Sequence, residues 1–93
     1  MTDVRQGDLR RLARSVWLDV TGMGPGLYCV TGGASPHEVR FTKTQRVCDC
    51  PDHTMNGNAN CKHVLAVRLA KGDLKVRRAL RLLIPQPKQR AAR

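Results

Sequence analysis

Residues 48–63 read C-D-C-P-D-H-T-M-N-G-N-A-N-C-K-H, and this stretch decides how the rest of the chain is organised. It gathers three of the four cysteines and one of the three histidines into two close pairs. Thiolate sulfur and neutral imidazole nitrogen are the ligands that Zn²⁺ prefers, and three cysteines with one histidine form a common closed structural set. The intervening residues are rich in Asn, Gly and Asp, which favour turns that bring the pairs together. The stretch therefore predicts one structural zinc ion bound by Cys48, Cys50, Cys61 and His63.

A disulfide framework and a catalytic zinc are the alternatives. Cys-x-Cys pairs seldom bridge each other, and nothing in the sequence indicates secretion. A catalytic zinc needs an open coordination position and a nearby general acid or base, and the H-x-E with P-C-x-x-C signature of zinc deaminases is absent. Asp49 and Asp52 are explained as turn residues, so we expect no enzymatic activity. His53 could replace a ligand, but Cys61-x-His63 already completes the set.

The two pairs and the apolar run after them resemble a SWIM-type zinc finger. C-D-C-P-D at 48–52 and C-K-H-V-L-A-V at 61–67 are phrases typical of that family. The resemblance covers residues 27–71, because the family also places a short hairpin before its first cysteine pair. His53 stands where the family usually has an aromatic residue, and Asn60 where proline often precedes the third ligand. The resemblance implies a binding module that contacts DNA or protein and often belongs to a larger DNA-handling protein.

An amphipathic helix is predicted over residues 8–20, with Asp8 as its N-cap. Trp17 lies on its apolar stripe, so we expect this side chain to anchor the core rather than to stack on a base. Residues 21–26, T-G-M-G-P-G, are expected to form a turn-rich break. The stripe consists of Leu9, Leu12, Ala13, Val16, Trp17 and Val20, and the opposite face carries Arg10, Arg11 and Arg14.

A β-hairpin is predicted next, with strands at 27–31 and 37–42 joined by G-G-A-S-P. We expect this hairpin to hold the first ligand pair, which begins at Cys48, at a rigid edge of the sheet. Cys29 lies far from both ligand pairs and is expected to be a small buried hydrophobic residue. His37 is expected at an exposed loop end.

Two helices complete the predicted fold. The first runs over residues 62–71 and ends at Gly72, a residue suited to a left-handed stop. The second begins after Asp73 and runs to Ile84, before Pro85. Its apolar side consists of Val76, Ala79, Leu80, Leu83 and Ile84, and its other side of Lys75, Arg77, Arg78 and Arg81.

The fold class is thus a small α+β zinc-binding domain in three regions: an N-terminal helix and linker (1–26), the zinc finger (27–72), and a C-terminal basic helix and tail (73–93). With one Trp, one Tyr and one Phe in 93 residues, the core is thin, and a domain this small needs a staple such as zinc. Reduced cysteines and the lack of an apolar run long enough for a membrane span predict an intracellular protein without membrane contact.

The charge predicts the partner. Seventeen Lys and Arg against seven Asp and Glu give a net charge of +10, which attracts polyanions, and nucleic acid is the commonest soluble one. We expect nucleic-acid binding, to DNA in preference to RNA. The alternative is a protein adaptor or homodimer that docks through the helix at 74–84. The expected nucleic-acid contacts are Arg46, Lys62, Arg68, Lys71, Arg77, Arg78 and Arg81.

Overall fold

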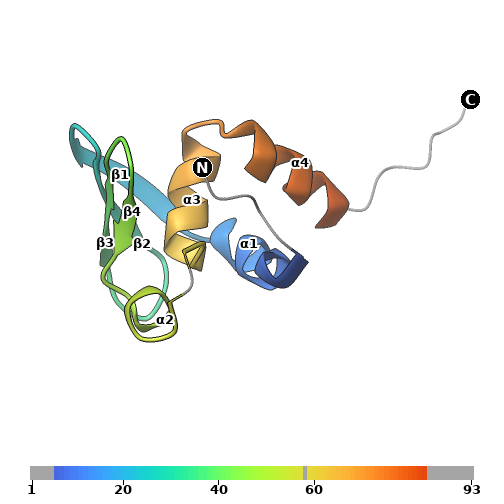
Figure 1. The fold of residues 1–93 in the computed structure, drawn as a ribbon, viewed down its shortest axis with the longest axis horizontal. Coiled ribbons are helices and arrows are strands. Elements are labelled where there is room, and N and C mark those ends of the chain that lie inside the picture. The colour runs from blue at the N-terminus through green and yellow to red at the C-terminus, as the bar shows by residue number, and fades with distance from the viewer. Residues whose placement is uncertain (1–5, 58, 84–93) are drawn as a thin grey trace, which may run out of the picture.

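Helix α3 (Lys62–Ala70) is the centre of the fold, with every residue from His63 to Arg68 buried. In the computed structural model, which describes residues 6–57 and 59–83, a four-stranded sheet covers one side of this helix. Helices α1 (Leu9–Ser15) and α4 (Leu74–Leu83) lie on its other side (Figure 1). The short 3-10 helix η1 (Gln6–Asp8) leads into α1, and the short helix α2 (Pro51–Thr54) follows the sheet. This arrangement confirms the predicted α+β class.

The sheet is antiparallel throughout, in the order β1-β2-β3-β4. Register places Tyr28 opposite Val39 and Val39 opposite Cys48, so these side chains share one face of the sheet. That face lies against α3, because Val39 and Cys48 belong to the same buried cluster as Val64 and Val67. The strands are β1 (Asp19–Gly24), β2 (Leu27–Thr31), β3 (His37–Phe41) and β4 (Arg46–Cys48).

The N-terminal helix is shorter than predicted. It ends at Ser15, whose hydroxyl donates to the carbonyl of Leu12 at 2.6 Å, and the chain then enters β1. Trp17 is 80% exposed, so the expectation that it anchors the core is wrong. Val20 instead joins the sheet side of the core. The expected division between residues 26 and 27 therefore falls inside the turn that joins the paired strands β1 and β2.

Two apolar clusters fill the interior. The first lies between the sheet and α3 and consists of Val30, Val39, Val64, Ala66 and Val67 together with Cys48, Cys50 and Cys61. The second lies between α3, α1 and α4 and consists of Leu12, Leu65 and Val76, with Leu9, Leu69, Ala79 and Leu80 packed against it.

The two C-terminal helices follow the prediction closely. Gly72 has a positive φ of 80° and ends α3, and Asp73 Oδ1 accepts hydrogen bonds from the backbone N–H groups of Lys75 and Val76 at the start of α4. Val76 is fully buried, so part of the apolar stripe of α4 is already covered. Ile84 and the tail at 85–93 lie outside the described residues. None of the helices in the described part of the chain is long and apolar enough to cross a membrane.

Candidate metal centre

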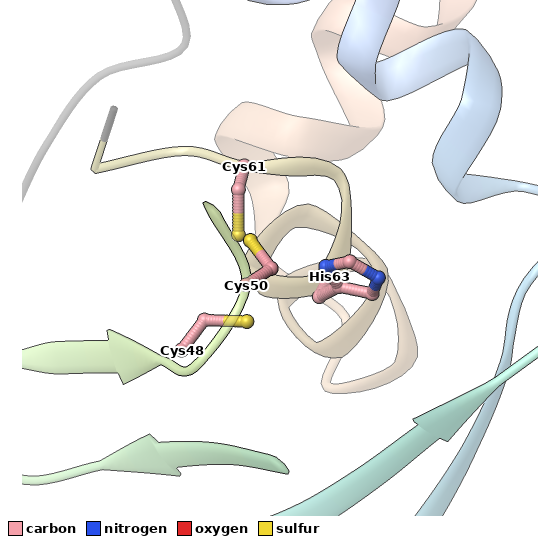
Figure 2. A group of neighbouring side chains, drawn as sticks. All are labelled: Cys48, Cys50, Cys61 and His63. Atoms are coloured by element: carbon pink, nitrogen blue, oxygen red, sulfur yellow. The ribbon is translucent and has the colours of Figure 1, made fainter. Parts of the chain in front are cut away.

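Four buried side chains converge where the end of β4 meets the start of α3 (Figure 2). They are Cys48, Cys50, Cys61 and His63, and their potential ligand atoms all lie within 4.8 Å of one another. Each residue is at most 4% exposed. The structure therefore brings the two sequence pairs together as one candidate metal site.

The local backbone explains how the cysteines reach this position. Cys48 ends β4, and both Cys50 and Cys61 occupy extended conformations immediately before a helix. At the start of α3 the N–H of Val64 donates to Cys61 Sγ at 3.5 Å. Unsatisfied N–H groups at helix N-termini stabilise thiolates, so this hydrogen bond by itself lowers the pKa of Cys61, against the larger effects of Cys48 and burial.

Two thiols of the cluster, those of Cys50 and Cys61, hold their protons more tightly than free cysteines do. The hydrogen bond with Cys48, and then burial, raise the pKa of Cys61 to about 12, and burial raises the pKa of Cys50. In addition, Nδ1 of His63 is buried and has no hydrogen-bond partner among the described residues. Sulfur atoms crowded together beside an orphaned imidazole nitrogen are the donor set of a soft, tetrahedral metal ion, so the residues fit such an ion.

His37 supports the site from the sheet, a role that the sequence did not reveal. Its ring lies 4.3 Å from that of His63 between centroids, and its Nδ1 lies 2.8 Å from Asp49 Oδ1. His37 is thus a half-buried residue that packs on a candidate ligand, and the expectation of an exposed loop end is wrong. The missed signal was the register: His37 pairs with Val30, which places its side chain on the face toward α3.

A polar chain runs behind the site and ties it to the helices. Arg68 is only 1% exposed, and it donates from Nη1 to Asn60 Oδ1 and from Nε to Asp73 Oδ2, both at 2.8 Å. Asn60 Nδ2 donates in turn to Asp8 Oδ2 at 3.2 Å. Asp8 therefore binds Asn60 and makes no side-chain cap on α1. Arg68, one of the expected nucleic-acid contacts, is therefore a buried side chain paired with Asn60 and Asp73 rather than an exposed cation.

The other predicted nucleic-acid contacts are distributed over β4, the two ends of α3, and α4. Lys62 at its start and Arg46 are half-buried, whereas Lys71 beyond its last turn is exposed. Arg46 lies over the ring of Phe41, and burial, with the nearby charge of Arg68, lowers its pKa. The three arginines of α4, namely Arg77, Arg78 and Arg81, are exposed.

Beside the metal centre lies a cavity of about 770 Å³, bounded by α1 and the start of α3. Arg11 in its wall donates to both carboxylate oxygens of Asp52, at 2.7 and 3.3 Å. Among the described residues, no hydrogen bond or ion pair joins a side-chain partner to Arg10, Arg14 or Lys62, which also line the cavity.

The remaining candidates lie outside the cluster. His53 is not one of the converging residues, and its contact with Cys50 is made by its backbone N–H. Cys29 is half-buried in β2 opposite Thr21 and Glu38, on the sheet face away from α3. It is thus less buried than expected.

Comparison of the chain with protein-family models, with curated proteins and with solved structures found no match.

Proposed function

We propose that this chain is a SWIM-type zinc module that binds nucleic acid, with one structural Zn²⁺ and no catalytic role. The observation that carries the proposal is the buried Cys₃His cluster in a chain of net charge +10. In this proposal the Cys₃His cluster stabilises the fold through zinc, and the positive charge attracts the nucleic acid.

Zinc is the ion that this donor set favours. Three sulfurs and one imidazole nitrogen complete a tetrahedron with protein ligands alone, so no open position remains for a substrate or a water. When bound, the ion supplies a cross-link between β4, α2 and α3. Cys48, Cys50, Cys61 and His63 would hold it, and the ring of His37, fixed by Asp49, would keep His63 in place.

The nucleic-acid part of the proposal is supported by cations for which residues 6–57 and 59–83 provide no side-chain partner. Arg10 and Arg14 on α1 and Lys62 on α3 border one cavity, and Arg77 and Arg78 project from α4. Unpaired surface cations of this kind are available to phosphates, and each phosphate that they neutralise releases counterions. Binding to DNA, or to RNA, should therefore weaken steeply with salt.

A salt titration tests this part directly. If the three α4 arginines contact phosphates, changing Arg77, Arg78 and Arg81 together to Ala should reduce the slope of log K against log salt on duplex DNA. The expected reduction is about 0.9 for each phosphate that is no longer neutralised. Arg10→Ala with Arg14→Ala tests α1 in the same way. All variants should keep their metal content, because none of these residues is a candidate ligand. A wild-type protein that binds neither DNA nor RNA at low salt would refute the nucleic-acid function.

A homodimer or adaptor is the second candidate, and exposed apolar side chains favour it. Leu74 at the start of α4 is 62% exposed and Trp17 is 80% exposed. Leu80 cannot serve as the docking residue in its present position, because it packs against the helix-side cluster. If α4 docks onto a second copy, Leu74→Asp should convert a dimer to a monomer in light scattering without loss of metal. A wild-type protein that is monomeric at high concentration would exclude the homodimer.

A further inference from the structure

A second cavity, of about 830 Å³, lies at the opposite end of α3 from the metal centre. One wall is formed by Lys43 in the turn between β3 and β4 and by Arg46 at the start of β4. The turn between α3 and α4 contributes the other through Lys71 and Asp73, and Tyr28 and Phe41 of the sheet also line it. The cavity is therefore formed by both layers of the fold.

The charge of this cavity is strongly unbalanced. Its walls contain five cationic side chains, those of Lys43, Arg46, Arg68, Lys71 and Lys75, and the single carboxylate of Asp73. That carboxylate is already used, because Oδ2 accepts from Arg68 and Oδ1 accepts from backbone N–H groups of α4. An anion that entered the cavity would meet excess positive charge.

Two arginines that line this cavity each carry a buried donor without an acceptor in the described part of the chain. Nε of Arg46 and Nη2 of Arg68 are both buried without a hydrogen-bond partner among the described residues. A buried guanidinium N–H left unpaired is costly, and a charged oxygen acceptor is the group that best satisfies it. Arg68 is held by Asn60 and Asp73, so this donor is fixed before any ligand arrives.

Aromatic rings lie beside these donors. Tyr28 and Phe41 meet edge to face with centroids 5.8 Å apart. The ammonium group of Lys71 lies 5.6 Å from the Tyr28 ring centroid and 5.7 Å from that of Phe41, and Nζ donates to the Tyr28 hydroxyl at 3.2 Å. Lys71 is exposed at the end of a flexible stem, so it can move from the rings to a phosphate.

We propose that this cavity binds one nucleotide of a single-stranded nucleic acid, its phosphate against Arg46, Arg68 and Lys71 and its base against Tyr28 and Phe41. Cations that follow the backbone and aromatic rings that accept bases are the two elements of single-strand binding. The inference rests on the proposed nucleic-acid function and assigns a place and a strand type to it. A duplex, whose bases are already stacked, gains only the phosphate contacts.

The test compares matched substitutions by fluorescence anisotropy with a single-stranded oligonucleotide and with a duplex of the same length. Lys71→Gln and Arg46→Gln should each weaken single-strand binding by about tenfold or more, as for loss of a hydrogen bond to a charged group. Arg78→Gln removes an equal charge from α4 outside the cavity and should cost clearly less. Because Arg46 also packs on Phe41, the exposed Lys71 is the decisive position if Arg46→Gln destabilises the fold.

A second measurement separates the cavity from the wider function. In nuclear magnetic resonance spectra, addition of inorganic phosphate and then of the oligonucleotide should shift the Nε–Hε signals of Arg46 and Arg68. An oligonucleotide that binds without moving these signals, or Lys71→Gln that behaves like Arg78→Gln, overturns the cavity and leaves the nucleic-acid function standing. A phosphate shift in a protein that binds no oligonucleotide overturns both the nucleotide assignment and the proposed function.

Discussion

The two sides of α3 are held in different ways. On the sheet side, the buried cluster contains no leucine, and three of its eight buried members are the cysteines of the candidate metal centre. On the helix side, Leu12, Leu65 and Val76 are fully buried, with further leucines packed around them. Valine and cysteine bury less apolar area than leucine, so each buried residue of the sheet-side cluster contributes less hydrophobic stabilisation, although Leu18, Tyr28 and Phe41 pack against that cluster. The contrast indicates that a metal bound by the candidate ligands would add its cross-link to the sheet-side cluster only.

Removal of the metal should cause the largest loss of stability, and the sheet side of α3 should unfold first. Binding to a structural zinc site is linked to folding by on the order of 10 kcal/mol. We expect Cys61→Ser or a chelator to abolish cooperative unfolding and the amide protection of β3 and β4, with residual helical signal from the other side. Metal analysis, thermal melts and hydrogen exchange measure this. A chelated protein with unchanged circular dichroism and melt would show that the two sides do not differ in this way.

Arg68 joins the two sides, and its loss should be the next largest effect. Arg68→Met removes the guanidinium that binds both Asp73 and Asn60, and breaking a buried charge pair costs about 3–5 kcal/mol. The matched control is Lys71→Met, because Lys71 is exposed and should change stability by about 0.5 kcal/mol or less. Denaturant unfolding with zinc present measures both. Equal stability of the two variants would contradict the buried role of Arg68.

The ion pair between Arg68 and Asp73 should also make the free energy of unfolding depend on pH. Burial alone would raise the pKa of Asp73, but the hydrogen bond and charge of Arg68, together with the backbone N–H groups of Val76 and Lys75, outweigh burial and hold this pKa below its ordinary value. A depressed carboxyl pKa contributes stability above the unfolded-state value, and that stability is lost as pH falls through the folded-state value. The stability difference between wild type and Asp73→Asn should therefore be constant near neutrality and shrink in acid.

Gly26 tests how tightly the sheet side is closed. It has a φ of 71°, and a Cβ at this position would meet the carbonyl oxygen of Phe41, whose N–H donates to Gly26 O at 2.7 Å. We expect Gly26→Ala to cost about 2–3 kcal/mol from strain and overlap together. Gly57→Ala is the control, because Gly57 has a similar φ of 70° and open space around it, and should cost about 1 kcal/mol. If thermal or denaturant unfolding shows equal stability losses for Gly26→Ala and Gly57→Ala, the backbone at Phe41 moves to make room for the added Cβ.

Cys29 should have the smallest effect. It lies on the sheet face away from α3 and outside the converging group, so Cys29→Ala should retain the metal and cost about 1 kcal/mol or less. Metal stoichiometry of the purified variant is the measurement. Loss of metal would mean that the sheet side uses a different third sulfur.

Sequence patterns predicted the parts of the fold that depend on local signals. The spacing of Cys48, Cys50, Cys61 and His63 located the candidate site, and Gly72 and Asp73 marked the boundary between the last two helices. Strand β1 was missed because its burial has no alternation and its glycines resemble a turn. The helical spacing of Val16, Trp17 and Val20 was accidental, since two of them are exposed and the third belongs to the sheet.

Long-range contacts account for the other errors. Arg68 looked like a surface cation, and only the fold brings Asn60 and Asp73 to it. His37 looked like a loop residue until strand register turned it toward His63. Such partners are far apart in the chain or depend on which face of a strand points inward, and composition and periodicity do not report either.

The hydrogen bond from Asn60 to Asp8 has a consequence for how this chain tolerates change in length. Asp8 fixes Asn60, the residue before Cys61, and Arg11 fixes Asp52 at the start of α2, so both ends of the inter-ligand loop are anchored independently of its middle. Around Gly57 nothing lies within 4 Å of a Cβ position. The closure entropy of a flexible loop grows only logarithmically, by about 0.6 kcal/mol for each doubling of length. The neighbourhood of Gly57 is therefore the place where extra residues, such as an epitope or a second recognition loop, can be inserted at little cost to the metal centre.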